Sequence, residues 1–538
     1  MNTRLQKIIK EIMLKLNDQT TSSTNTLAVP ALNNFGLSRM LLVAALAIGA
    51  FLRVWKINAM GFNTDEAVYA GQAASIAGIS GLKDIFPVFR AHPLFIQFLL
   101  SLVYKINFTD LAGRLLAVIA GVGTIYLTYL IGKNMYGRVI GSLAALFLAF
   151  MPYHVLVSRQ MLLDGPMVFF ATLTIYALVR FARSQKNVWL IAAGSSMGLT
   201  FLSKETSIVL LGAIFAFFAL TPEIRVKIKD MLLSLLAFVL VVLPFPLSLI
   251  LSSGGSSTGL SYLTWQLFRR PNHEWSFYLT SLPPFIGVIT LIAAAAGFLL
   301  LWRNRSWREK LLVVWIAVCF IFFQLWPVKG FQYLLPIAPV IAILAARTLG
   351  KLLDKFDEDV LPGLMTRLPG RSVIASLLIT ATVLTMGFTT WQRIQPETST
   401  AFLAGTGGVP GGREAGTWIK ANIPLYARLL TIGPSMSNIL QFYGERHAFG
   451  LSVSPNPLHR NPSYTPIVNP DLQIRRTDLN YIVWDSYSAS RSPFFSDKLL
   501  SYVKKYNGTA VHTETISLLD AEGKQIEKPV IVIYEVHP

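Results

Sequence analysis

The chain has 538 residues, of which 53% are hydrophobic and only 14% are charged, and its mean hydropathy is +0.52. A soluble globular protein carries about 25% charged residues, so this composition excludes a protein whose whole surface lies in water. The formal net charge of +19 does not indicate nucleic-acid binding. The Lys and Arg residues lie mostly in short connectors between apolar segments, where they determine membrane topology. The single cysteine, Cys319, excludes an intramolecular disulfide.

Residues 1–37 are predicted to form a cytoplasmic tail. Apolar residues recur at helical spacing from Leu5 to Leu16, with lysines between them. This pattern is typical of a basic amphipathic helix that lies on an anionic membrane surface. A frayed basic tail explains the same pattern equally well.

Eleven apolar segments within residues 38–392 approach the roughly 20 residues that a helix needs to cross a bilayer. They are Ser38–Ile57, Gly113–Ile131, Val139–Val155, Gly165–Phe181, Val188–Leu202, Thr206–Leu220, Met231–Leu251, Pro283–Trp302, Leu311–Trp326, Phe331–Ala346 and Ser372–Trp391. The apolar segment Leu94–Ile106 is too short to span, and we expect a helix that lies in the membrane interface. The fold class predicted from these segments is a polytopic α-helical membrane protein with about 11 transmembrane helices.

The charges in the connectors predict the orientation of the spans. With the amino terminus in the cytoplasm, every connector on the cytoplasmic side is basic, as the positive-inside rule requires. The basic residues of these connectors are Lys133, Arg138, Arg180, Arg183, Lys186, Arg225, Lys227, Lys229, Arg303, Arg305, Arg308, Lys310, Arg347, Lys351, Lys355, Arg367 and Arg371. The first outer loop, residues 58–91, then lies on the other side of the plasma membrane. We therefore expect a multi-pass protein with an extracytoplasmic active site.

Residues 393–538 differ in composition from the preceding part and are predicted to form a soluble, extracytoplasmic α/β domain. Helices are expected at 414–422 and 497–506, and strands at 427–432, 480–484 and 530–536. No catalytic motif is evident in this part of the sequence.

The strongest candidate for catalysis is the pair Asp65-Glu66 in the first outer loop. Thr64 is a plausible helix N-cap, which places both carboxylates in the first helical turn, where the helix dipole favours their ionised forms. Acidic residues are common at helix starts for that reason alone, so a purely structural role is the alternative. A second candidate, Asp164, precedes a Gly-Pro pair at the outer end of a predicted span, where helix capping is its alternative role.

Several cations are predicted to lie on the same side of the membrane as these acids. They are Arg90, Arg159, Lys204 and Lys329, with His92 beside Arg90. Each alone is more typical of a side chain that anchors the end of a span. Together with the acids they form a chemically coherent set. A carboxylate can accept a proton from an attacking hydroxyl, and cations can stabilise a departing phosphate. The sequence has no Gly-rich phosphate loop, so a nucleotide-sugar donor is not indicated.

At these residues the chain resembles the GT-C superfamily of membrane glycosyltransferases. The likeness is to the branch that holds the protein O-mannosyltransferases and the lipid A aminoarabinose transferase, and it covers about residues 38–391. It rests on the order and spacing of four motifs. These are the Asp-Glu pair at 65–66, His-Pro-Leu at 92–94, Ser-Arg…Asp-Gly-Pro at 158–166 and Lys-Gly-Phe-Gln-Tyr-Leu-Leu-Pro at 329–336.

The resemblance implies an inverting transfer of a monosaccharide from a polyprenyl-phosphate donor. The sugar would be mannose-like or another hexose or pentose, and the acceptor a hydroxyl of a protein, a lipid or a polysaccharide. It implies that Asp65 is the catalytic base, with Glu66 beside it, and that Asp164 is a second acidic residue of the site. The candidates for binding the donor phosphate are Arg90, His92, Arg159, Lys204 and Lys329.

The chain departs from the family pattern in two places. Many relatives have two prolines after the histidine, whereas this chain has Pro93 and then Leu94. The outer loop 252–282 is too short to hold the β-trefoil domain of the eukaryotic O-mannosyltransferases. The zinc site of the aminoarabinose transferase does not map onto Arg90 and His92, so we predict no metal ligands and no certain cofactor, and leave a divalent cation open.

Two other classes of protein remain as alternatives. A transporter or flippase for a lipid-linked sugar is expected to place functional charges along a path within the spans and to show paired halves. Here the ionisable groups lie at the outer ends of the spans, and no internal repeat is evident. An envelope scaffold whose C-terminal domain binds a partner is the other alternative.

Overall fold

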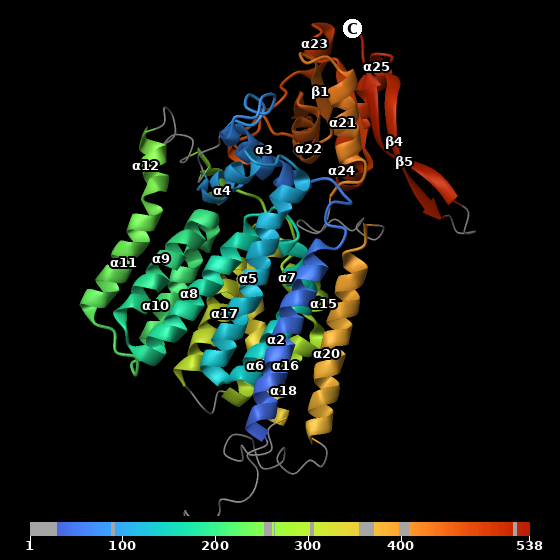
Figure 1. Cartoon of the computed structure of the whole chain (residues 1–538). Coiled ribbons are helices and arrows are strands. Elements are labelled where there is room, and N and C mark those ends of the chain that lie inside the picture. The colour runs from blue at the N-terminus through green and yellow to red at the C-terminus, as the bar shows by residue number, and fades with distance from the viewer. Residues whose placement is uncertain are drawn as a thin grey trace, which may run out of the picture.

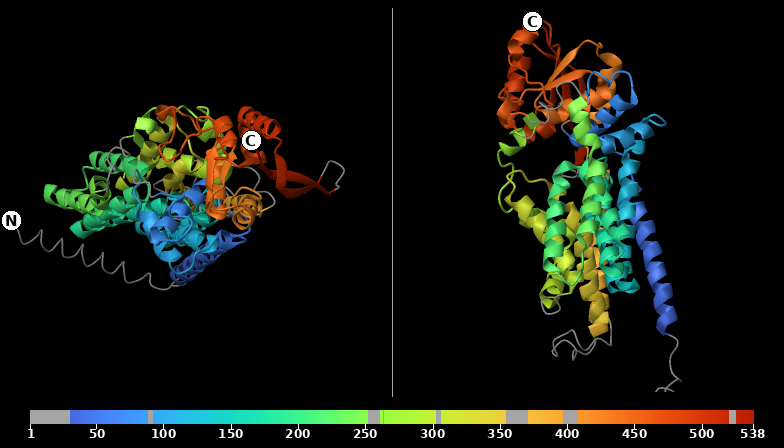
Figure 2. Two further views of the ribbon diagram at one scale, coloured as in Figure 1. Left: turned by 90° about the horizontal axis from the view of Figure 1, so that it is seen from above. Right: turned by 90° about the vertical axis from the view of Figure 1, so that its left-hand side faces the viewer.

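The computed structural model describes residues 30–87, 92–251, 261–262, 264–301, 306–353, 371–396, 408–519 and 525–538. The predicted amphipathic helix near the amino terminus lies outside these residues, and so does Arg90. A bundle of long helices is followed by an α/β domain that lies over one end of the bundle (Figure 1). Two further views show the same arrangement, with α2 along one side of the bundle (Figure 2).

The bundle contains every predicted span as a helix or a pair of helices. Its elements are α2 (Pro30–Val54), α5 (Asp110–Tyr136), α6 (Arg138–Phe150), α7 (Pro152–Ser158), α8 (Asp164–Ser184), α9 (Asn187–Ser203), η1 (Glu205–Ile208), α10 (Val209–Leu220), α11 (Ile228–Val242), α12 (Pro244–Leu251), α14 (Phe277–Ser281), α15 (Pro283–Ile286), α16 (Val288–Leu301), α17 (Trp307–Leu325), η2 (Phe331–Ile337), α18 (Ala338–Leu353) and α20 (Arg371–Arg393).

By the criteria of helix length and composition, the described residues contain fewer membrane crossings than the eleven predicted. Among the described residues, five helices are long and apolar enough to span, or up to eight if each bent pair of helices counts as one span. The predicted number of eleven is therefore not confirmed. The helix α9 has only 17 residues, Glu205–Leu220 is also short, and α17 begins with three charged residues in its first turn. The apolar helices nevertheless indicate a membrane protein.

Breaks inside two of the spans have clear sequence causes. The pair α6 and α7 bends by 62° where Pro152 opens α7, because proline lacks the N–H that would continue the hydrogen bonding of α6. The segment Phe277–Ile286 meets α16 at 105°, and Gly287 between them has a φ of +94°, which favours glycine. The short helix α7 that follows the first bend ends at Ser158, and the segment 159–163 connects it to α8.

Two short helices, α3 (Thr64–Ala77) and α4 (Phe95–Tyr104), lie between the bundle and the C-terminal domain (Figure 1). The helix α4 occupies the segment predicted to form an interfacial helix. One face of α3 carries small buried residues, and a side chain at Gly71 would collide with Phe86. Small residues therefore let neighbouring segments approach α3 closely.

The C-terminal domain contains a five-stranded sheet with the strand order β2-β1-β3-β5-β4. The strands are β1 (Arg428–Thr431), β2 (His447–Gly450), β3 (Tyr481–Asp485), β4 (Thr509–Leu519) and β5 (Gln525–Glu535). The pairs of β1 with β2 and with β3 are parallel, whereas β5 pairs antiparallel with β3 and with β4. The helices are α21 (Gly412–Asn422), α22 (Pro434–Gly444), α23 (Pro470–Arg475), α24 (Ser486–Arg491) and α25 (Pro493–Lys505). The helix α22 packs against α3.

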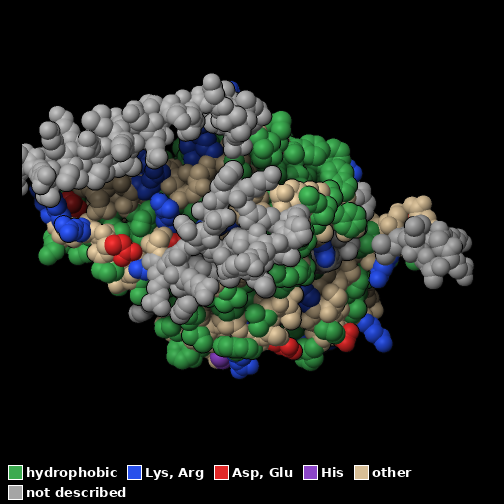
Figure 3. Space-filling model, turned by 90° about the horizontal axis from the view of Figure 1, so that it is seen from below, with side chains coloured by type: hydrophobic (Ala, Val, Ile, Leu, Met, Phe, Trp, Pro, Cys, Tyr) green, Lys and Arg blue, Asp and Glu red, His purple; other side chains and the backbone are tan. Residues whose placement is uncertain are grey.

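The opposite end of the bundle is rich in basic residues. Figure 3 shows Lys and Arg side chains on this face, with a few Asp and Glu side chains among them. A buried ion pair joins Arg347 of α18 to Glu309 of α17 at 2.9 Å, and the Tyr136 hydroxyl of α5 lies 3.2 Å from the same carboxylate. Three helices are thus fixed to one another at this end.

Aromatic residues gather where α2 and α20 end, near the C-terminal domain. The rings of Trp55 and Trp391 lie 5.2 Å apart, and Phe51 stacks on Trp391 at 6.4 Å. The Trp55 indole N–H donates to the Gln395 side chain at 3.4 Å. Tryptophan is enriched at membrane–water boundaries because its ring is apolar and its N–H is polar.

Candidate active site

The first turn of α3 presents Asp65 at the end of the bundle. The N-cap is Asn63, one residue before the predicted Thr64, and its side chain accepts the Glu66 backbone N–H at 3.0 Å. The Glu66 carboxylate in return accepts the Asn63 N–H at 3.1 Å, which completes a capping box. Asp65 is half-buried. Burial raises the pKa of its carboxyl; the nearby Lys204 ammonium acts in the opposite direction, while the Asp164 carboxylate adds to the increase.

Asp164 and Lys204 form a buried ion pair beside Asp65. The Lys204 Nζ lies 2.8 and 2.9 Å from the two Asp164 carboxylate oxygens. Asp164 is 2% exposed and opens α8, and Lys204 ends α9 and lies over the Tyr333 ring at 4.9 Å. A buried pair contributes little net stability, but it holds both charges in a fixed geometry. The structure thus brings together three of the predicted residues, Asp65, Asp164 and Lys204.

His92 belongs to the same end of the bundle and contacts the neighbour of Lys204. Its Nδ1 lies 3.2 Å from a carboxylate oxygen of Glu205, and its ring meets the edge of Tyr262 at 4.5 Å. Glu205 was not predicted as a site residue, although it directly follows Lys204. The two neighbours therefore pair with different segments: Lys204 with α8, and Glu205 with the residues before α4.

Glu66 faces away from this cluster and into a buried ion pair. Its two carboxylate oxygens each lie 2.8 Å from the Arg114 guanidinium of α5, and one of them also accepts the Met161 backbone N–H at 2.9 Å. Glu66 is fully buried. With both oxygens occupied, this geometry favours a positioning role over the catalytic role predicted for it. Glu66 joins α3, which carries Asp65, to the segment that leads to Asp164.

Arg159 is also occupied by protein groups. Its guanidinium donates to the backbone carbonyls of Leu52, Arg53 and Trp55, at 2.6 to 3.2 Å. These are carbonyls at the C-terminal end of α2, which have no partner within the helix. The geometry therefore favours a capping role for Arg159 rather than the predicted binding of a phosphate.

Lys329 lies in the segment before η2. Its ammonium donates to the Trp326 carbonyl at 3.3 Å and lies over the Trp275 ring at 5.5 Å. Its backbone forms two hydrogen bonds with the Asn272 side chain, at 2.8 and 2.9 Å. Lys329 is connected to the Asp65 cluster indirectly, through η2. This helix carries Tyr333, whose ring lies against the Lys204 ammonium.

A cavity of about 400 Å³ opens between the outer segment 264–270 and the C-terminal domain. Its lining residues are Trp265, Phe268, Arg269, Arg270, Ser454 and His459. Arg269 lies over the Trp265 ring at 4.6 Å. Burial raises the pKa of Asp65, and the Arg269 charge acts in the opposite direction. Consecutive arginines next to a tryptophan in a long outer loop were the signal that could have selected these residues from the sequence.

The C-terminal domain contributes two tyrosines that the sequence did not mark. These are Tyr464, in the segment after β2, and Tyr487, in α24. Burial raises the pKa of each hydroxyl, and the charge of Asp65 adds to the increase. Nothing in the local sequence identifies them, because their position depends on how the domain sits on the bundle.

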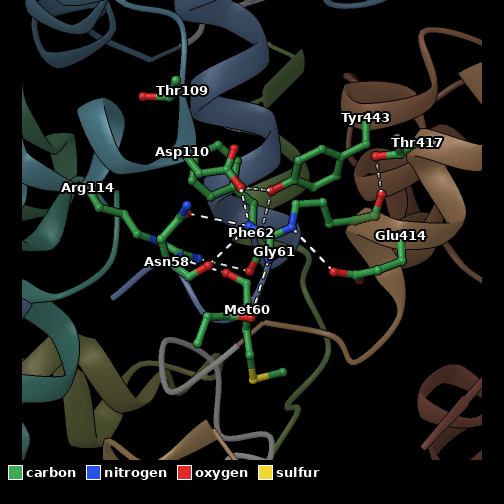
Figure 4. A network of polar contacts seen from close by, with 12 residues as sticks. Asn58, Met60, Gly61, Phe62, Thr109, Asp110, Arg114, Glu414, Thr417 and Tyr443 are labelled. Carbon is green, nitrogen blue, oxygen red and sulfur yellow. Dashed lines mark hydrogen bonds and ion pairs between the residues drawn. The ribbon is translucent and has the colours of Figure 1, made fainter. Parts of the chain in front are cut away.

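A network of polar contacts joins the two parts of the chain next to this site (Figure 4). The Tyr443 hydroxyl of α22 donates to the Asp110 carboxylate at 2.5 Å and accepts the Phe62 backbone N–H at 2.7 Å. Arg413 of α21 lies 3.4 Å from the same carboxylate. Among the described residues, no three His, Cys, Asp or Glu side chains converge as a metal site would require.

Residues 91–250 match the family model described as dolichyl-phosphate-mannose-protein mannosyltransferase. Two proteins of Bacillus subtilis (strain 168), YkcB and YycA, are named as candidate mannosyltransferases. Each is 31% identical, over 132 and 145 residues, which are 24% and 26% of this chain. The matched segments span only 18% and 21% of the length of these relatives.

The fold is shared with solved membrane enzymes. The apo structure of ArnT from Cupriavidus metallidurans has a TM-score of 0.65 at 15% identity, and the match covers 93% of this chain and 98% of ArnT. An oligosaccharyltransferase from Archaeoglobus fulgidus has a TM-score of 0.61 at 15% identity, covering 91% of this chain and 74% of that chain. The chain therefore has the fold of these enzymes, and its predicted resemblance to the GT-C glycosyltransferases is confirmed.

Proposed function

We propose that the chain is a membrane glycosyltransferase that moves a monosaccharide from a polyprenyl-phosphate carrier to a hydroxyl group of an acceptor. The observation that carries this proposal is the environment of the half-buried Asp65. Its carboxyl lies within the electrostatic influence of the Asp164–Lys204 pair and of Arg269, which lines the cavity. Support also comes from two solved proteins with a similar fold, ArnT bound to undecaprenyl phosphate and the oligosaccharyltransferase AglB in complex with a dolichol-phosphate.

Asp65 acts as the general base in this proposal. Its carboxylate accepts the proton of the acceptor hydroxyl, and the hydroxyl oxygen forms a bond to the anomeric carbon of the sugar. The bond between that carbon and the phosphate oxygen breaks on the opposite face, and its electron pair remains on the phosphate. The configuration at the anomeric carbon is therefore inverted. Burial suits Asp65 to this role, because a raised pKa makes the ionised carboxylate a stronger base.

Cations around Asp65 stabilise the phosphate as it departs. Lys204 is fixed by Asp164, and Arg269 and Arg270 line the cavity from the outer segment 264–270. The planar guanidinium of arginine can donate two parallel hydrogen bonds to two oxygens of one phosphate, and a charge that is already in position costs no reorganisation during the reaction. We assign the phosphate to these three residues in preference to Arg159 and Lys329, whose donors contact backbone carbonyls. His92 remains a candidate through its contact with Glu205.

The proposal includes the location of the reaction. The protein would lie in the plasma membrane with the tail 1–37 in the cytoplasm, the catalytic helices 38–392 in the bilayer and the domain 393–538 outside. The basic end of the bundle supports this orientation (Figure 3). The partners would be the lipid-linked sugar, the bilayer and a hydroxyl-bearing protein, glycolipid or polysaccharide.

Replacement of the base tests the proposal directly. Purified protein in liposomes is supplied with radiolabelled polyprenyl-phosphate sugars, mannose first, and a membrane extract that contains acceptors. We expect Asp65→Asn to lower the transfer rate by roughly 10²–10⁴-fold, the usual contribution of a general base. Asp84→Asn in the same outer loop is the matched control, since Asp84 is exposed, and should transfer at the wild-type rate. Transfer by Asp65→Asn at the wild-type rate would remove the assignment, and a wild type that moves intact carrier across the bilayer without transfer would indicate a flippase.

A further inference from the structure

We propose that Tyr443 and Arg413 of the C-terminal domain are positioning residues for Asp65, so that this domain is part of the catalytic unit. The inference rests on the proposed function for its catalytic readout. Tyr443 and Arg413 hold the connector 57–62, which leads from α2 to α3 (Figure 4). Because Asp65 lies in the first turn of α3, they thereby also hold Asp65 in place.

From the side of the bundle, the connector is held by Arg114. Its guanidinium donates to the carbonyls of Ile57, Met60 and Gly61 at 2.6 to 2.9 Å, and it also pairs with Glu66 in α3. Arg114 is 4% exposed. The Arg114 guanidinium therefore holds both the connector before α3 and Glu66 in the first turn of α3.

From the side of the C-terminal domain, Tyr443 and Arg413 hold the same connector. The Tyr443 hydroxyl accepts the Phe62 N–H, the last backbone donor before the N-cap, and donates to Asp110 of α5. Arg413 pairs with Asp110 and donates to the carbonyls of Asn58 and Ala59, at 3.2 and 3.3 Å. The connector lies between two sets of donors, one from each part of the chain.

The fit around the connector leaves little space for it to move. A side-chain carbon at Gly61 would lie 2.7 Å from Arg413 Cβ, and one at Gly408 would lie 2.2 Å from the Gly61 carbonyl oxygen. The Thr64 hydroxyl in α3 also donates to the Ser435 carbonyl of α22 at 3.2 Å. Since a displacement of about 1 Å at a reacting group can reduce a rate by about 10²-fold, the placement of the domain affects catalysis without direct contact with the substrate.

The test removes one hydroxyl group. Tyr443→Phe keeps the ring, which packs against Phe62 and Phe442, and deletes the bonds to Asp110 and to the Phe62 N–H. The matched control is Tyr502→Phe in α25, which makes the same chemical change in the second apolar core of the domain. Two measurements are made on the full-length protein: kcat and KM for the lipid-linked donor, and hydrogen–deuterium exchange of amides 62–67.

We expect Tyr443→Phe to lower kcat about tenfold or more with little change in the donor KM, and to accelerate exchange at 62–67. Tyr502→Phe should match the wild type in both measurements. Faster exchange with unchanged kcat would overturn the proposal by showing a purely structural contact, and so would unchanged exchange with unchanged kcat. If the wild type transfers no sugar, the proposed function fails. The exchange data then still decide whether the domain orders the start of α3.

Discussion

At the scale of single residues, three acids near the start of α3 and α8 have different environments. Asp65 is half-buried with cations nearby, Asp164 is neutralised by Lys204, and Glu66 is neutralised by Arg114. Proton transfer requires a carboxylate that is basic and accessible, whereas a carboxylate locked between donors serves to hold segments together. The environment therefore assigns different roles to side chains of the same chemistry.

The charge of Asp164 should affect the pH dependence of transfer. Asp65 must be ionised to act as a base, so the transfer rate should fall as the pH decreases toward the raised pKa of Asp65. Asp164 is one cause of that increase. Removal of its negative charge in Asp164→Asn lowers the pKa of Asp65, and the acid limb of kcat/KM should move to lower pH, even though the maximal rate decreases. The measurement is a pH–rate profile of the residual transfer. An acid limb that stays in place or moves to higher pH would argue against electrostatic coupling between the two acids.

At the scale of elements, α3 is held by its own capping box and by one arginine from α5. Arg114 connects α3 with α5 through its ion pair with Glu66. The Gln160 side chain accepts from Asn63 Nδ2 at 2.8 Å and connects the capping box of α3 with the segment 159–163. Since α3 has only 14 residues, it would be marginal as an isolated helix in water. Its stability depends on these tertiary contacts.

Replacement of Arg114 by lysine tests this dependence. A lysine keeps the charge but cannot reach three carbonyls and a carboxylate at once, because it lacks the planar array of donors. A buried acceptor left without a donor costs about 1–3 kcal/mol, so we expect Arg114→Lys, which leaves more than one carbonyl without a donor, to be less stable by about 3 kcal/mol. Thermal unfolding in detergent measures the difference. Arg183→Lys, at the exposed end of α8, should unfold like the wild type, and an Arg114→Lys protein of equal stability would contradict the role of the guanidinium.

Much of the helical part could be predicted, because apolar length and basic connectors are local properties of the sequence. The roles of Arg159 and Glu66 could not, since each depends on a partner about 100 or 50 residues away. The strands β2 and β4 were not predicted. The strand β2 has only four residues. The strand β4 lies at the edge of the sheet with no buried residue from 509 to 517, so its sequence lacks the apolar alternation of a half-buried strand. Asp65 and Asp164 were selected because conspicuous motifs carry them, whereas Lys204 was selected as a cation at the outer end of a predicted span.

At the scale of the whole molecule, the C-terminal domain and the basic connectors lie at opposite ends of the bundle (Figures 1 and 3). The two ends would then contact different aqueous compartments, and the acid cluster would share its compartment with the C-terminal domain. The single cysteine of the sequence, Cys319, is buried, so maleimide labelling of an introduced cysteine can be measured without strong background labelling.

Labelling of intact cells tests this arrangement. Asp84→Cys lies in the exposed part of the first outer loop, and Lys186→Cys lies in the exposed connector between α8 and α9. With a membrane-impermeant maleimide, we expect Asp84→Cys to react in intact cells and Lys186→Cys to react only after permeabilisation. The unsubstituted protein serves as the background control. The opposite result would invert the orientation, and labelling of both sites in intact cells would place both ends in one compartment.

The paired tryptophans at the ends of α2 and α20 would set the depth of the protein in a bilayer. Indole rings prefer the headgroup region, so Trp55 and Trp391 would lie at the surface of one leaflet. Asp65 follows Trp55 by ten residues, through a connector held against the bundle. A long isoprenoid carrier that lies in this leaflet would present its phosphate near the acid by its own partitioning. The protein would then need to provide little of the free energy that brings the sugar to the reacting group.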